Sequence, residues 1–235
     1  MQGGTILATN NGGATWSRLT PPAGVGGLDG VACPTTNICL AVGDGSGDAG
    51  TIYTTTDGGT TWTASTPSAF AGGFATAVAC STARVCEVAG TAIGAAILGT
   101  TDGGTTWVSQ HIKGQVQEIS GISCPSTSTC EAIDPFLDTA YRTTDGGATW
   151  KLQHHFSRSP SAVACSTAEI CEVTTGTVFG TIDGGTSWTS QPLPTGAAQG
   201  ISCPTADVCY AVGSDSGTGV VFKREGNSDS PALRH

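Results

Sequence analysis

The stretch TTDGGTTW, residues 55–62, decides the fold of this chain, because the sequence repeats it almost letter for letter four more times. The other copies are TNNGGATW (9–16), TTDGGTTW (100–107), TTDGGATW (143–150) and TIDGGTSW (181–188). The chain of 235 residues contains five tryptophans, and each of them ends one copy. A repeat period near 40 residues is typical of β-propeller blades, so the phrase predicts a repeat architecture.

Ten cysteines form a second repeat in step with the first. They fall in five pairs, with five residues between the members of each pair. The pairs are Cys33/Cys39, Cys80/Cys86, Cys124/Cys130, Cys165/Cys171 and Cys203/Cys209. Zinc sites usually have shorter spacings and histidine partners, and none of the four histidines lies near a pair. The spacing therefore predicts five hairpin disulfides and an oxidising compartment, with free thiols or a metal as the competing interpretation.

Each repeat reads as four antiparallel strands. A short first strand ends at the first cysteine of a pair, and a second strand leaves its partner. The third strand is rich in β-branched and aromatic residues, as in GTIYTTT (50–56). The D-G-G sequence then supplies a turn, because glycine adopts positive φ without steric cost, and the fourth strand begins at T-T-W. Four such strands per repeat predict one propeller blade.

The motif T-x-D-x-G-x-T-W resembles the Asp box of the BNR repeat family. The resemblance implies a structural hairpin between the third and fourth strands of a blade, in which the acidic residue pins its own turn and the tryptophan packs between blades. The residues given this role are Asn11, Trp16, Asp57, Trp62, Asp102, Trp107, Asp145, Trp150, Asp183 and Trp188. The chain is most similar in character to secreted bacterial BNR or photosystem II assembly-factor-like proteins. The family also includes sialidases, other glycoside hydrolases, receptors and lectins, so the box indicates architecture and not activity.

These patterns predict an all-β fold, a β-propeller of five four-stranded antiparallel Asp-box blades. A single domain would span residues 1–225, with a disordered tail at 226–235. Residues 4–20 supply only a third and a fourth strand, and residues 199–213 only a first and a second. Their pairing would complete the fifth blade and close the ring. The segment GVVFKREGN (219–227) either competes with the N-terminal strand for this place or begins a sixth blade.

Composition excludes several classes of partner. The chain has nine Lys plus Arg against 18 Asp plus Glu, a formal net charge of −9, and its basic residues are scattered. Nucleic acids and anionic membrane surfaces require clustered basic residues, and no apolar run is long enough to span a membrane. We expect no cofactor and no metal, because the calcium-like spacing of Asp44 and Asp48 lacks the remaining ligands. The N-terminus shows no signal peptide, so the expected secreted or cell-surface location depends on the cysteines.

An enzyme is the less favoured hypothesis. A sialidase would place three arginines at equivalent positions of different blades, and the six arginines here do not follow that pattern. A glycosidase needs two carboxylates facing one cleft. The positions expected to line a central channel offer one acid in five, and they are Asp29, Thr76, Ser120, Ser161 and Gln199. Glutamates also follow the second cysteine in three repeats, where we expect them to be solvated or to bridge blades, and they are Glu87, Glu131 and Glu172.

Binding is expected on the loops that vary most between repeats, because variable loops on a rigid scaffold usually carry function. The candidate ligand-binding residues are His111, Lys113, His154, His155, Phe156 and Arg158. We therefore predict a secreted, non-catalytic binding or scaffold module that recognises a glycan or an extracellular protein through its loop face or through pockets between blades. The alternatives are a sialidase-like glycoside hydrolase, or a fragment of one, and an assembly factor for a protein complex.

Overall fold

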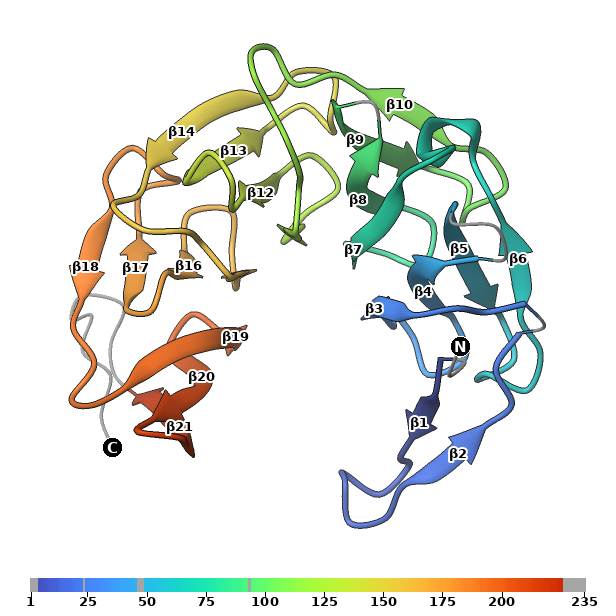
Figure 1. The fold of residues 1–235 in the computed structure, drawn as a ribbon, viewed down its shortest axis with the longest axis horizontal. Coiled ribbons are helices and arrows are strands. Elements are labelled where there is room, and N and C mark those ends of the chain that lie inside the picture. Colours follow the sequence, from blue (N-terminus) through green and yellow to red (C-terminus); the bar gives the residue numbers. More distant parts are fainter. Residues whose placement is uncertain (1–3, 23, 46–48, 93, 226–235) are drawn as a thin grey trace. The chain divides into compact units, whose positions relative to one another are not determined.

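The computed structural model describes residues 4–22, 24–45, 49–92 and 94–225 (Figure 1). The predicted tail, 226–235, lies outside the described residues, as does Asp48 of the calcium-like loop. The described part consists of 21 strands and one short 3-10 helix, and none of its helices is long and apolar enough to cross a membrane. The chain divides into two compact units, Met1–Ser109 and Gln110–His235.

The first unit contains a hairpin followed by two four-stranded sheets, which we call blades 1 and 2. The hairpin consists of β1 (Ile6–Ala8) and β2 (Ser17–Leu19). Blade 1 consists of β3 (Leu28–Ala32), β4 (Cys39–Asp44), β5 (Gly50–Thr55) and β6 (Thr63–Ser65). Blade 2 consists of β7 (Phe74–Cys80), β8 (Cys86–Ala92), β9 (Gly94–Thr100) and β10 (Val108–Gln110), with the helix η1 (Ser68–Phe70) before it. In both blades the strands lie in sequence order.

The second unit contains two further four-stranded sheets, blades 3 and 4, and a last sheet of three strands. Blade 3 consists of β11 (Gly121–Ser123), β12 (Cys130–Asp134), β13 (Thr139–Thr143) and β14 (Lys151–His155). Blade 4 consists of β15 (Ala162–Cys165), β16 (Cys171–Thr174), β17 (Val178–Thr181) and β18 (Thr189–Gln191). The last sheet consists of β19 (Ala197–Thr205), β20 (Val208–Asp215) and β21 (Thr218–Glu225). The predicted four-stranded antiparallel blade is confirmed.

The third position of the last sheet is held by β21. This strand pairs with β20 along its whole length, from Val208↔Glu225 to Asp215↔Thr218. The segment 219–227 is therefore, as far as residue 225, a third strand, while β1 pairs with β2. Closure of a five-bladed ring by pairing of the N-terminal with the C-terminal strands is not confirmed and stays a prediction, as does the single domain of residues 1–225.

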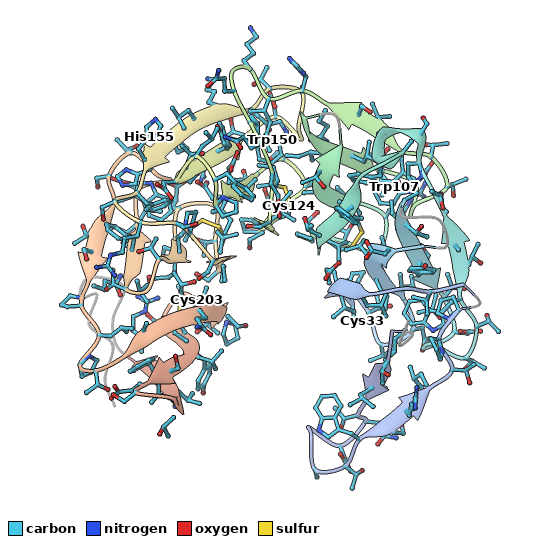
Figure 2. The ribbon with its side chains drawn as sticks, viewed as in Figure 1. Cys33, Trp107, Cys124, Trp150, His155 and Cys203 are labelled. Atoms are coloured by element: carbon cyan, nitrogen blue, oxygen red, sulfur yellow. A yellow bond between two sulfur atoms is a disulfide. The ribbon has the colours of Figure 1, made fainter. Side chains whose placement is uncertain are left out.

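All five predicted disulfides are present, and each joins the first and second strands of a sheet (Figure 2). The Cα atoms of each pair lie 4.0–4.1 Å apart. Because each loop is short, one bridge stabilises the fold by about 2–3 kcal/mol through the entropy of the unfolded chain. The bridges are Cys33–Cys39, Cys80–Cys86, Cys124–Cys130, Cys165–Cys171 and Cys203–Cys209.

The hairpin around Cys203 and Cys209 differs from the prediction. We expected the first strand to end at Cys203 and the second to begin at Cys209, but β19 continues to Thr205 and β20 already begins at Val208. Cys209 is therefore an interior residue of its strand, 1% exposed, and it lies opposite Arg224 of β21. In blades 1 and 4 the equivalent cysteines instead begin their strands.

The missing Asp box gives the physical reason for this difference. In blade 1 the Asp-box turn holds the cysteine loop, since Gly58 N–H donates to the carbonyl of Asn37 at 2.9 Å. In the sequence no Asp box follows β21, and Arg224 of this strand contacts the cysteine loop in place of a turn. The Arg224 guanidinium donates to the carbonyl of Ala206 at 3.0 Å and contacts Cys209 Sγ at 3.2 Å. The last disulfide is thus covered by an arginine and not by a turn.

The Asp-box turns are held by one hydrogen-bond pattern. In the copy at 143–150, Asp145 Oδ1 accepts the backbone N–H of Thr149 and the hydroxyl of Thr143, both at 2.8 Å, and its Oδ2 accepts the Thr149 hydroxyl at 2.6 Å. Asn11 accepts the N–H of Thr15 in the same way at 3.0 Å. The hydroxyl and N–H donors of Thr149 lower the pKa of Asp145 to about 2. These side chains stabilise their own turns.

The hydrophobic core lies between consecutive sheets of a unit. In the first unit, Leu40, Val42 and Ile52 of blade 1 pack with Val88 and Leu98 of blade 2. In the second unit, one cluster joins blades 3 and 4, and another joins blade 4 to the last sheet through Val178, Ala198, Ala211 and Phe222. Within each unit a sheet therefore buries one face against the next sheet.

Candidate functional site

The six residues predicted to bind a ligand differ in burial: two are buried or half-buried and four are exposed. Phe156 is 5% exposed and lies in the core between blades 3 and 4, with Ile133 and Val173. The His154 ring is half-buried and lies 4.8 Å from the Phe156 ring and 5.9 Å from that of Trp188. Burial lowers the pKa of His154, and His155 lowers it further. The remaining four are exposed: His111, Lys113, His155 and Arg158.

We expect Phe156→Ala to lower the free energy of unfolding by about 3–5 kcal/mol, because it opens a cavity in a packed aromatic cluster. The matched control, His155→Ala, changes an exposed neighbour and should stay within about 0.5 kcal/mol of the unchanged protein. Urea denaturation measures both. A Phe156→Ala protein as stable as the control would contradict the core assignment.

The three glutamates that follow a second cysteine are buried. Glu87 is 4%, Glu131 0% and Glu172 3% exposed, so the expectation of solvated carboxylates was wrong. Glu131 Oε2 lies 3.4 Å from Arg142 Nη1 on the next strand of the same blade. Glu172 Oε1 lies 3.3 Å from Nη2 of Arg224 on β21, so this ion pair does bridge two sheets.

Desolvation has the largest effect on the pKa values of Glu131 and Glu172. Burial raises the pKa of Glu131 to about 8 and that of Glu172 to about 7, although the facing Arg142 and Arg224 lower them. Glu172 borders a small cavity of about 60 Å³ that it shares with Gln191 and Arg224. A cavity of this size holds water but no sugar ring. The ion pairs Glu131–Arg142 and Glu172–Arg224 are thus structural elements, one within blade 3 and one between blade 4 and the last sheet.

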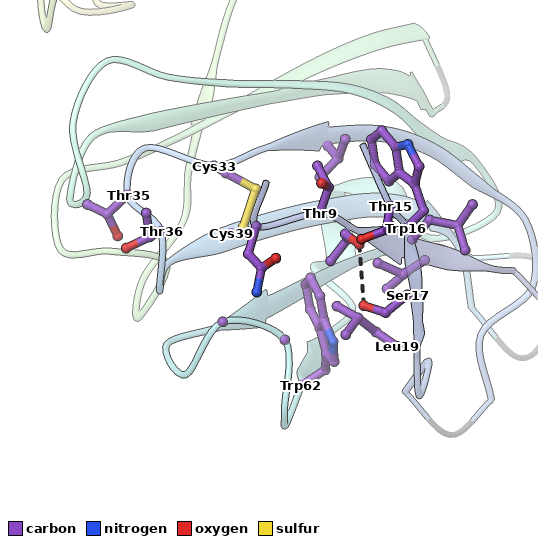
Figure 3. A pocket seen from close by; sticks show the side chains of 17 residues that line it. Thr9, Thr15, Trp16, Ser17, Leu19, Cys33, Thr35, Thr36, Cys39 and Trp62 are labelled. Carbon is purple, nitrogen blue, oxygen red and sulfur yellow. Dashed lines mark hydrogen bonds between the residues drawn. A yellow bond between two sulfur atoms is a disulfide. The ribbon is translucent and has the colours of Figure 1, made fainter. Parts of the chain in front are cut away.

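A hollow of larger size lies within the first unit. It has a volume of about 790 Å³ and lies between the β1–β2 hairpin and blade 1 (Figure 3). We call it the hairpin groove and define it by the side chains that matter most for its chemistry. On the hairpin side these are Leu7, Trp16 and Leu19, and on the blade side Val31, the Cys33–Cys39 disulfide and Trp62. Sequence reasoning missed this site, although residues 4–20 carried its signal, a third and a fourth strand without the first two.

The hairpin groove is uncharged and mainly apolar, with six hydroxyl or amide side chains in its lining: Thr9, Asn10, Thr15, Ser17, Thr35 and Thr36. Three of its side chains are unusually open for their type, since Leu7 is 55%, Trp16 61% and Val31 65% exposed. The tryptophan at the same place of another Asp box, Trp150, is 3% exposed. None of the 17 lining residues carries a titratable side chain, apart from cysteines joined in a disulfide. The groove can therefore bind apolar groups and hydrogen-bonding backbone, but it offers no acid or base.

One wall of the groove is β1, a strand whose second edge has no strand partner among the described residues. Ile6, Leu7 and Ala8 of β1 line it in succession. Within the described residues, β1 takes β2 as its neighbour, whereas the corresponding strand of blade 1, β5, lies between β4 and β6. An unpaired edge presents backbone N–H and C=O groups that pair readily with another strand.

These features define the class of protein, a β-propeller fold. Each of blades 1 to 4 contains one disulfide and one Asp-box turn. Residues 141–152 match the family model described as BNR/Asp-box repeat. The chain thus has the fold of a BNR-like propeller and carries a match to this repeat. No curated protein matches its sequence.

Solved structures with the same fold serve different purposes. The chain resembles "YCF48 bound to D1 peptide" with a TM-score of 0.66 and 15% identity, over 88% of this chain and 67% of that one. It resembles the GH74 enzyme of Niastella koreensis with a TM-score of 0.61 and 19% identity, over 86% of this chain and 30% of the enzyme. A chain of a nidogen/laminin complex gives 0.66 and 12% identity, over 89% and 80%. At these identities the likeness shows the fold alone.

Proposed function

We propose that the protein is a non-catalytic binding or scaffold propeller that takes an extended segment of a protein partner into the hairpin groove. One observation carries the proposal: the same groove combines an open strand edge with uncharged, mainly apolar walls. An extended peptide can add to such an edge through backbone hydrogen bonds, while its alternate side chains enter the apolar part of the groove. Affinity then comes from the backbone and specificity from the contacts with Leu7, Val31 and Trp62.

Two of the comparisons favour a protein partner, although a GH74 enzyme shares the same fold. One structure of similar fold is described as bound to a peptide and another as part of a protein complex. The five disulfides indicate an oxidising environment, so we propose that the partner is met outside the cell or in an equivalent compartment. Among the described residues, the buried Glu131 and Glu172 each face an arginine, which supports a non-catalytic role over a glycoside hydrolase.

The test is an array of extended ten-residue peptides, with a glycan array in parallel, probed with the oxidised protein. We expect apolar peptides to bind and to shift the fluorescence of Trp16 and Trp62. Val31→Lys should weaken binding at least about tenfold, a loss of about 1.4 kcal/mol. Ile182→Lys is the matched control, because Ile182 is 57% exposed and lies outside the groove. Selective glycan binding without peptide binding, or equal effects of both variants, would refute the proposal.

A further inference from the structure

We infer that the hairpin groove accepts a β-hairpin with the chemistry of the first two strands of a blade, and that this hairpin completes β1–β2 into a four-stranded sheet. The inference rests on the proposed function and names the class of segment that the groove selects. Its basis is the repeat itself, because other blades of the same chain show what occupies the equivalent place.

The first step is the equivalence of β1 with the third strand of a blade. Counted back from the threonine that opens each Asp box, Leu7 corresponds to Tyr53 in β5 and to Tyr141 in β13. Tyr53 is 1% and Tyr141 4% exposed, whereas Leu7 is 55% exposed. In blade 1 the second strand lies directly beside this position, with Ala41 opposite Tyr53. The exposed Leu7 therefore marks the place of a second strand.

The second step concerns the opposite wall. Val31 stands two residues before the first cysteine of its pair, and the equivalent residues are Val78, Val163 and Ile201. Each of these packs against the hydrophobic cluster that its own sheet shares with the preceding one. In the first unit that cluster contains Leu40 and Val42 from the second strand of blade 1. The exposed Val31 is thus the surface on which a second strand would place its apolar side chains.

Together the two walls specify the chemistry of the occupant. Its second strand should carry apolar residues at the first and third positions after a cysteine, as Leu40 and Val42 do after Cys39 in blade 1. The residue between them should be small, as Ala41 is. A disulfide before this strand would hold the hairpin in its bound form and lower the entropic cost of binding. The groove therefore selects a hairpin of the pattern G-x-x-C-x5-C-(apolar)-A-(apolar).

The probe is the oxidised peptide QGISCPTADVCYAVG, which has the sequence of residues 199–213 and fits this pattern. We expect it to bind the intact protein one to one by isothermal titration calorimetry. Hydrogen exchange should show at least about tenfold greater protection, when the peptide is bound, of those amides of residues 5–9 that point away from β2, because backbone pairing slows exchange. The matched control peptide carries Tyr210→Lys and Val212→Lys, and keeps its length and its disulfide.

The outcomes separate this inference from the proposed function. Binding of the hairpin but not of its lysine control, reduced at least about tenfold by Leu7→Lys in the protein, supports the inference. Equal binding of both peptides overturns it, and so does the absence of hairpin binding when the amides of residues 5–9 that point away from β2 are already protected in the free protein. If linear peptides from the array bind while the hairpin does not, the proposed function stands and this inference fails. If neither binds, both fail.

Discussion

Replacement of Arg224 by methionine is expected to lower the free energy of unfolding by about 3–5 kcal/mol at pH 8, because it removes the cation that faces a buried carboxylate. The Arg224 and Glu172 side chains are 2% and 3% exposed, with 3.3 Å between Nη2 and Oε1. The same guanidinium donates to the carbonyl of Ala206 at 3.0 Å and so ties β21 to the β19–β20 loop. The loss combines the missing counter-charge of Glu172 with a broken strand contact.

The size of this loss should depend on pH. Burial raises the folded-state pKa of Glu172 to about 7, above its ordinary value of 4.5. A carboxyl group whose pKa is raised on folding contributes most below the unfolded pKa, and its contribution is lost as pH rises through the folded pKa. Removal of Arg224 takes away a charge that lowers this pKa, so the proton is held to still higher pH. The difference between Arg224→Met and the unchanged protein should therefore be smallest near pH 4.5 and largest above pH 7.

Two controls make the result interpretable. Arg158→Met removes an exposed arginine and should stay within about 0.5 kcal/mol of the unchanged protein. The double variant Arg224→Met/Glu172→Gln removes the buried charge as well and should recover part of the stability, which a double-mutant cycle measures. Denaturant titrations at pH 4.5 and pH 8 provide the data. A loss that is equal at both pH values would show that the charge of Glu172 is not its cause.

Val178→Lys is expected to cost more than about 3 kcal/mol, whereas Val221→Lys, at the equivalent position of the last sheet, should change stability by less than about 0.5 kcal/mol. Val178 is fully buried, as is its equivalent Ile52, because each is covered by the following sheet. Val221 pairs with Val212 in the same register, yet it is 67% exposed. Lysine is thus placed in a core in one case and in water in the other.

The same pair of variants tests whether any sheet covers β21 in solution. Thermal unfolding and urea denaturation of the two proteins under identical conditions suffice, since the substitutions and their places in the repeat are matched. A large loss in Val221→Lys would mean that this face is covered in solution, as closure of a ring or continuation of the array would require. A small loss in Val178→Lys would contradict the core itself.

Much of the fold could be predicted from the sequence, because its signals are local. An Asp box spans eight residues, and its hydrogen bonds join positions no more than four apart, as between Asp183 and Ser187. Each disulfide joins cysteines six positions apart. Interactions of so short a range form independently of distant parts of the chain. Their repetition then defines the blade. The exception is Cys209, whose strand starts earlier than predicted because no Asp box follows to hold its loop.

That the six candidate residues bind a ligand stays a prediction, and the structure shows that adjacent residues of one segment face opposite ways. His154 and Phe156 turn toward blade 4, while His155 between them is exposed. The alternation of a strand produces this result, and composition alone could not tell which member of the run would be covered. Whether the exposed His111, Lys113, His155 and Arg158 bind a ligand stays a prediction.

The sequence by itself determined the structure of one repeat: the strand order within a blade, the turn and the disulfide. All three are set by contacts between near neighbours in the chain. Only the tertiary structure decided which residues lie against each repeat. It buried Glu172 beside Arg224, which is 52 positions away, and it left Leu7 and Val31 open at the hairpin groove. The physical reason is that burial depends on the neighbouring sheet, and equivalent residues of near-identical repeats meet different neighbours.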